Sequence, residues 1–118
     1  MTKAAQEKFD LRRGDAWEGM TFPFKRAGDP NFWNNPIVRS QIRDLNGNLI
    51  YEFEITPVIT VVSGDGYLSV GLIIPDGDAS KDFPVGRFVG DIEVTTDAMP
   101  TTTLVEYSGS IHPDVSHS

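Results

Sequence analysis

Short segments in which apolar and polar residues alternate run along most of the chain. A period of two predicts half-buried β-strands, because successive side chains of a strand point to opposite faces of the sheet. The clearest runs cover residues 38–43, 49–56, 67–74, 88–94 and 104–111. Phe9 and Leu11 indicate a short opening strand, and Phe22 and Phe24 mark a second one. Because Pro23 lacks an N–H group, that second strand must lie at a sheet edge or carry a bulge.

The apolar side of each run is expected to face the core. Its members are Val38 and Ile42; Leu49, Tyr51, Phe53 and Ile55; Leu68, Val70, Leu72 and Ile74; Phe88, Ile92 and Val94; and Val105, Tyr107 and Ile111. No segment longer than about ten residues keeps the 3.6-residue period of an amphipathic helix. We therefore expect a core built from strands.

Glycine, asparagine and proline mark the turns between the runs. Asn46-Gly47 predicts a hairpin closed by a type I′ turn, in which both central residues adopt positive φ. Gly64-Asp65-Gly66 predicts a second tight turn, and residues 97–100 predict a third. Asp78 is expected to cap one helical turn that ends before Pro84.

The number and spacing of these strands predict the fold class. About seven short strands, with a turn signal roughly every 8–12 residues, are typical of an all-β, immunoglobulin-like antiparallel β-sandwich. The 118 residues suffice for one such domain, and the 39% that are hydrophobic supply its core. We expect an N-terminal arm over residues 1–7, the sandwich over residues 8–112 and a C-terminal tail over residues 113–118. The sequence has no cysteine, so the domain lacks the cysteine pair of antibody domains.

The net charge is −7, and its sign changes along the chain. Residues 1–45 hold eight basic and six acidic side chains, whereas residues 46–118 hold two basic and eleven acidic ones. An acidic surface repels phosphate backbones, so we expect no nucleic-acid partner. Either strands from the two parts interleave and neutralise one another, or an acidic patch faces a basic patch on another copy or another protein.

The apolar runs are short throughout the chain. None approaches the ~20 residues that span a bilayer. Residues 1–10 also lack the apolar stretch of a secretory signal. We therefore expect no membrane partner.

Three motifs suggest chemistry, and each has a simpler explanation. Residues 76–82 place carboxylate and hydroxyl oxygens at alternate positions, as a calcium loop does, but basic residues stand where that loop needs its glycine and its bidentate glutamate. Arg13-Gly14-Asp15 spells the integrin-binding tripeptide and is also ordinary turn sequence. His112 and His117 have no nucleophile or ligand motif beside them. We therefore expect no enzyme activity, no metal and no cofactor.

Two apolar segments are candidates for a protein interface. Phe32 and Trp33, in the loop of residues 27–36, either plug one end of the sandwich or anchor a partner. Plugging is favoured, because a loop aromatic on a small domain gains most of its burial energy locally. Ile59 and Val61 either extend a strand or form an apolar edge that pairs with another chain. These four residues make up the candidate interface.

Several short motifs follow one another in a familiar order. They are residues 13–17 followed by Met20 and Phe22, residues 38–44 with Asn46-Gly47, and residues 50–53, 64–70, 83–94, 103–104 and 109–115. In this order the chain resembles the immunoglobulin-like structural modules of tailed bacteriophages. It is similar in pattern to the N-terminal domain of the siphophage baseplate upper protein and to small tail-associated virion proteins. The most specific run is 84–91, whereas residues 32–36 depart from the family's usual turn before its third strand.

The resemblance implies a structural role in a virion that is assembled in the cytoplasm of a host bacterium. The expected protein is a tail or baseplate component that docks onto other virion structural proteins and onto copies of itself, without catalysis or a cofactor. A capsid decoration protein of the same fold is one alternative. Another is a carbohydrate-binding or host-adhesion module, in which Phe32, Trp33 and Tyr67 would stack on sugar rings.

Overall fold

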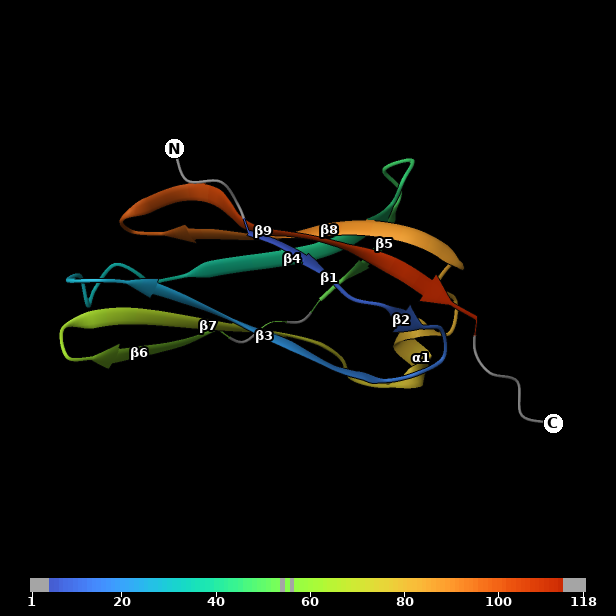
Figure 1. The fold of residues 1–118 in the computed structure, drawn as a ribbon, viewed down its shortest axis with the longest axis horizontal. Helices are drawn as coiled ribbons and strands as arrows, with labels where there is room; N and C mark the ends of the chain where they lie inside the picture. The colour runs from blue at the N-terminus through green and yellow to red at the C-terminus, as the bar shows by residue number, and fades with distance from the viewer. Residues whose placement is uncertain (1–4, 54, 56, 114–118) are drawn as a thin grey trace.

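The structure is a computed structural model that describes residues 5–53, 55 and 57–113. Two β-sheets pack face to face in an elongated sandwich with principal extents of 55 × 26 × 19 Å (Figure 1). Its elements, in chain order, are β1 (Ala5–Lys8), β2 (Leu11–Arg12), β3 (Trp17–Arg26), β4 (Ile37–Asp44), β5 (Leu49–Glu52), β6 (Val58–Val62), β7 (Asp65–Ile74), the helical turn α1 (Gly77–Ser80), β8 (Gly86–Thr96) and β9 (Met99–His112).

The strands divide between the sheets in the immunoglobulin-like manner. One sheet has the order β1-β9-β8-β4-β5, with β2 also pairing with β9, and the other has the order β3-β7-β6. Neighbouring strands are antiparallel, except that β1 and β2 run parallel to β9. The chain changes sheet four times, between β2 and β3, β3 and β4, β5 and β6, and β7 and β8, and in this way encloses a core between the two sheets. The predicted all-β sandwich is therefore confirmed.

The described residues form nine strands where about seven were expected. One additional strand is β1, which includes the last residues of the expected arm and pairs with residues 105–108 of β9. The other is β6, which places Ile59 and Val61 in a strand of their own at the end of the smaller sheet. Pro23 lies in β3 at the opposite end of that sheet, so the edge position predicted for this proline is confirmed.

The alternating runs place their apolar faces in the core as predicted, with one exception. Val38, Tyr51 and Ile55 are partly buried against the core, and the fully buried members are Ile42, Phe53, Leu68, Val70, Leu72, Ile74, Phe88, Ile92, Val94, Val105, Tyr107 and Ile111. Leu49 was expected to join them and is 52% exposed. The reason is a register shift between β4 and β5, which pairs Leu49 with the exposed Arg43 and so turns its side chain to the outer face of the sheet. Phe53 reaches the core from beyond the end of β5.

The turn chemistry differs from the prediction at two hairpins. At the β4–β5 hairpin only Gly47 has positive φ, at 88°, so the turn is not type I′. Asp44 organises this loop instead, because its carboxylate accepts hydrogen bonds from the backbone N–H groups of Asn46 and Asn48 at 2.9 Å each. Both central residues of the β6–β7 turn have positive φ, Ser63 at 52° and Gly64 at 82°. The type I′ geometry is therefore found between β6 and β7.

The helical turn is capped by Asp76 and not by Asp78. The Asp76 carboxylate accepts a hydrogen bond from the N–H group of Ala79 at 2.9 Å. Asp78 lies one residue inside the turn, where an acidic side chain suits the exposed N–H groups of a helix start. The predicted helical turn is confirmed, and its cap lies two residues earlier than expected.

A tyrosine crosses three strands inside the sandwich. Tyr107 of β9 lies opposite Gly90 of β8, and its ring passes over this glycine to reach β4. There its hydroxyl lies 2.6 Å from the Ser40 hydroxyl, within hydrogen-bond distance, and donates to the Gln41 carbonyl at 3.4 Å. Burial raises the pKa of Tyr107. Among the described residues, no buried side-chain nitrogen or oxygen lacks a hydrogen-bond partner.

Candidate docking surfaces

The aromatic loop packs onto its own domain. Trp33 is 4% exposed, and its indole N–H donates to the Gly66 carbonyl of β7 at 3.3 Å. Its ring meets Phe32 edge-on with centroids 4.9 Å apart and lies 6.1 Å from Phe24. Phe32 is half-buried beneath the Arg26 guanidinium, which lies 4.5 Å from the ring centroid. Trp33 therefore plugs one end of the sandwich and offers almost no surface to a partner. Its place in the candidate interface is corrected accordingly.

Strand β6 is the exposed part of the candidate interface. All five of its residues are exposed, with Ile59 at 38% and Val61 at 54%. The strand lies at the free end of the three-stranded sheet, along the lower margin of Figure 1. Ile59 and Val61 pair with Leu68 and Gly66, which are buried, so their side chains lie on the core side of the sheet. They remain exposed at the rim of the sandwich.

Two residues of β6 direct their backbone groups away from β7, its one partner strand among the described residues. In a hairpin closed by a two-residue type I′ turn, the pair next to the turn exchanges both of its hydrogen bonds, and bonded and non-bonded pairs then alternate. Here that first pair is Val62 with Asp65. Counting back along β6, the N–H and C=O groups of Ile59 and Val61 point away from β7, toward the free edge. These four groups can bind a further strand.

The β6 edge lacks the usual protection against such pairing. Natural edge strands carry lysine, proline or a bulge that prevents another strand from adding to them. The sequence Val58-Ile59-Thr60-Val61-Val62 has no charge and no proline, and its register with β7 is continuous. The ion pair of Lys25 with Asp65 at 3.6 Å joins β3 to β7 and places no charge on β6 itself. The β6 edge is therefore the best docking surface in the described structure.

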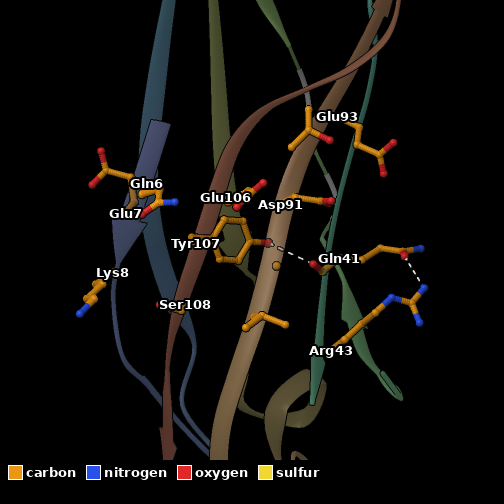
Figure 2. Close-up of a pocket in the computed structure, with 13 residues that line it drawn as sticks. Gln6, Glu7, Lys8, Gln41, Arg43, Asp91, Glu93, Glu106, Tyr107 and Ser108 are labelled. Carbon is orange, nitrogen blue, oxygen red and sulfur yellow. Dashed lines mark hydrogen bonds between the residues drawn. The ribbon is translucent and has the colours of Figure 1, made fainter. Parts of the chain in front are cut away.

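A shallow groove crosses the outer face of the larger sheet. Its volume is about 830 Å³, and it runs over β1, β9, β8 and β4 (Figure 2). Asp91, Glu93 and Glu106 lie along its middle, while Lys8 and Arg43 flank it on opposite strands. Basic side chains from residues 1–45 thus lie among acidic side chains from residues 46–118. The ion pair of Arg39 with Glu52 at 3.4 Å repeats this arrangement, which favours interleaving over separate charged patches.

The groove disfavours the charged form of the Asp91 carboxyl. Partial burial raises the pKa of this carboxyl, and the nearby charges of Glu93 and Glu106 raise it further, while Arg43 acts in the opposite direction. A carboxyl whose pKa is higher in the folded state than in the unfolded state favours folding when it is protonated. That contribution is complete below the unfolded pKa near 3.8 and is lost as the pH rises through the folded pKa.

Replacing Asp91 with asparagine is therefore expected to stabilise the protein at neutral pH. The variant keeps the shape of the side chain and removes a charge that is half-buried beside two others. Thermal denaturation should give a higher Tm for Asp91→Asn than for the parent chain at pH 7, and the difference should shrink below about pH 4, where both side chains are neutral. A lower Tm at pH 7 would show that the attraction to Arg43 outweighs the repulsion.

The other motifs that the sequence singled out have structural roles. The turn at Arg13-Gly14-Asp15 is anchored to α1, because the Ser80 hydroxyl accepts from the Gly14 N–H at 3.1 Å and donates to the Asp15 carbonyl at 2.8 Å. His112 lies on the surface with its Nε2 atom 3.3 Å from an Asp10 carboxylate oxygen. The Ser110 N–H group and His112 together lower the pKa of Asp10. His117 lies outside the described residues.

Two further findings concern metal sites and membranes. Within residues 5–53, 55 and 57–113, no group of three or more histidine or acidic side chains is placed to hold a metal ion, the acidic segment 76–82 included. In that same part of the chain, no helix has the length and apolar character needed to cross a bilayer.

Comparison with known proteins gives few matches. No family model matches the sequence, and no curated protein matches it. Among solved structures, the chain is similar to part of a family 123 glycoside hydrolase from Clostridium perfringens, from a study of glycolipid glycan hydrolysis. The match has 20% identity and a TM-score of 0.45, and it covers 92% of this chain and 23% of the hydrolase. The chain thus spans less than a quarter of that protein's length, and the likeness carries no conclusion about activity.

Proposed function

We propose that this chain is a non-catalytic assembly domain, a bacteriophage virion structural protein of the tail or baseplate, that docks onto its neighbours through the β6 edge. The observation that supports docking is the exposed, uncharged and continuous strand β6, with four outward-pointing backbone groups at Ile59 and Val61. Strand addition to a sheet edge gains affinity from main-chain hydrogen bonds and specificity from alternate side chains. The virion setting is supported by the order of motifs along the sequence.

The adhesin alternative receives less support from the same structure. A sugar-binding platform needs aromatic faces open to solvent, and the Trp33 ring is covered by its own loop and by Phe24. Tyr67 is half-buried, with the Lys25 ammonium 5.8 Å from its ring centroid. The capsid decoration alternative requires the same docking surface and differs only in the place of the chain on the particle.

Val61→Lys is expected to prevent docking without harming the fold. Val61 is 54% exposed, so its replacement should change the free energy of unfolding by no more than about 0.5 kcal/mol. An added strand would have to cover the new ammonium group, which is how lysine protects natural sheet edges. Val89→Lys is the matched control, because Val89 is 42% exposed on the other sheet.

The experiment supplies each chain in trans to a phage that lacks it and probes purified particles with an antibody raised against the chain. The parent chain and Val89→Lys should be found on the particles at a defined site, whereas Val61→Lys should be reduced at least about tenfold, a difference of 1.4 kcal/mol in docking. Particles that carry Val61→Lys at the parental level would contradict docking through β6. Particles that never carry the parent chain would contradict the virion role.

A further inference from the structure

We propose that the strand that adds to β6 is the β6 strand of a second copy of this chain, antiparallel to the first and related to it by a two-fold axis through Thr60. This inference rests on the proposed docking function, and it names the occupant of that surface. The two three-stranded sheets would join into one six-stranded sheet of order β3-β7-β6-β6-β7-β3.

The backbone groups of the β6 edge are self-complementary in this register. A two-fold axis at Thr60 places Ile59 of one copy opposite Val61 of the other, and the same pair recurs on the far side of the axis. Ile59 and Val61 are the two residues whose N–H and C=O groups point outward. Each pair therefore exchanges two hydrogen bonds, and all four outward groups of each copy find partners. A register shifted by one residue would place outward groups opposite residues whose groups are already bonded to β7.

The side chains of β6 suit a copy better than a charged partner. In a two-fold interface the same patch of one molecule meets itself, so any charge on the patch would lie near a like charge. The net charge of −7 makes most of this surface repel its own copies, and β6 has no charged side chain. The axis also brings Ile59 beside Val61 of the other copy on the core side of the joined sheet, where both side chains are exposed in the single chain.

The size of the edge predicts weak pairing in free solution. A stable interface covers about 800 Å² on each partner. A five-residue strand is only about 17 Å long and covers far less. We therefore expect free chains to pair reversibly, and copies held close together in an assembly to pair much more completely, because a high local concentration replaces intrinsic affinity.

A single cysteine can test the register, because the chain has none of its own. Thr60 is exposed and lies on the proposed axis, opposite Thr60 of the other copy in a non-hydrogen-bonded pair with Cα atoms about 4.5 Å apart. That separation fits a disulfide, for which the Cα atoms must lie within about 7 Å. Val58 is the matched control on the same face of the strand, 54% exposed. Its two copies would lie about 13 Å apart, too far for a disulfide.

In the experiment the full chain, as Thr60→Cys or Val58→Cys, is purified reduced, checked for an unchanged Tm, and oxidised with glutathione disulfide. The proposal predicts that Thr60→Cys forms a covalent dimer at least about tenfold faster than Val58→Cys at the same concentration. Equal rates would indicate random collision and would overturn the register. If neither variant forms a dimer while Val61→Lys still prevents incorporation into particles, the second copy is ruled out and the docking function stands. If Val61→Lys is incorporated normally, the docking function itself fails.

Discussion

Replacing Trp33 with alanine is expected to lower the free energy of unfolding by about 3–5 kcal/mol. The indole is 4% exposed and fills the space between its loop and the smaller sheet, in contact with Phe24 and Phe32. Its removal leaves a cavity under a loop whose turn hydrogen bonds, such as that from the Phe32 N–H to the Asp29 carbonyl at 3.3 Å, resist collapse into the space. The loop also lies very close to β7, because a Cβ atom at Gly66 would stand 2.7 Å from the Asp29 carbonyl oxygen. The measurement is urea denaturation of the parent chain and the variant.

A second variant separates the ring from its hydrogen bond. Trp33→Phe keeps most of the buried apolar area and removes the N–H group that donates to the Gly66 carbonyl. We expect it to cost about 1–3 kcal/mol, because that carbonyl is left without its partner. If Trp33→Ala instead melts with the parent chain and fails only in assembly, then the loop aromatics serve a partner and the plug interpretation is wrong.

Replacing Gly90 with alanine is expected to cost about 3 kcal/mol or more. Gly90 lies beneath the Tyr107 ring, and a Cβ atom there would stand 2.6 Å from both the Tyr107 Cζ atom and the Gln41 carbonyl oxygen. Backbone cannot move aside as a side chain can, so the ring must shift and β4 and β8 must separate locally. Overpacking of this kind costs about 1–3 kcal/mol, and the lost contact between the Tyr107 and Ser40 hydroxyls adds to it.

Gly71→Ala is the matched control for this prediction. Gly71 also lies inside a strand, and its added Cβ atom would have the Thr21 hydroxyl oxygen as its nearest contact at 4.0 Å, an ordinary separation. We expect this variant to be neutral or to gain about 0.4–1 kcal/mol, because alanine restricts the unfolded chain more than glycine does. The measurement is thermal denaturation of both variants, in which the Tm should fall for Gly90→Ala and stay level or rise for Gly71→Ala. Equal effects would show that the loss at Gly90 comes from strand conformation and not from the crossing of Tyr107.

Much of the fold could be predicted because it depends on local alternation. The alternation of Leu68, Val70 and Leu72 predicts a strand with one face in the core, and Pro23 predicts a strand at a sheet edge or with a bulge. Leu49 was misplaced because the register shift between β4 and β5 turns its side chain to the outer face, and the alternation of residue types along the sequence does not reveal such a shift. The type I′ turn was assigned to Asn46-Gly47 because that pair is the commonest signal for it. In the structure the Asp44 carboxylate instead binds the N–H groups of Asn46 and Asn48, and the turn there is not type I′.

The candidate site was only partly accessible from the sequence. The run of β-branched residues in β6 predicts a strand, and its lack of charge suggested an edge that could pair. Which of its backbone groups are free follows from the register with β7, which the turn at Ser63 and Gly64 sets. Trp33 was ambiguous because a loop aromatic has no period from which to infer its direction. The groove at Asp91 was missed because its carboxylates come from β8 and β9 and meet only through strand pairing.

Amide hydrogen exchange at β6 tests the central claim most directly. In the free chain at low concentration, the N–H groups of Ile59 and Val61 point to solvent and should exchange fast, whereas that of Thr60 is bonded to β7 and should be protected. In the assembled state, protection should appear at Ile59 and Val61, because an added strand binds these two groups. Protection that appears on the larger sheet in the assembly, with Ile59 and Val61 still exchanging fast, would contradict docking through the β6 edge.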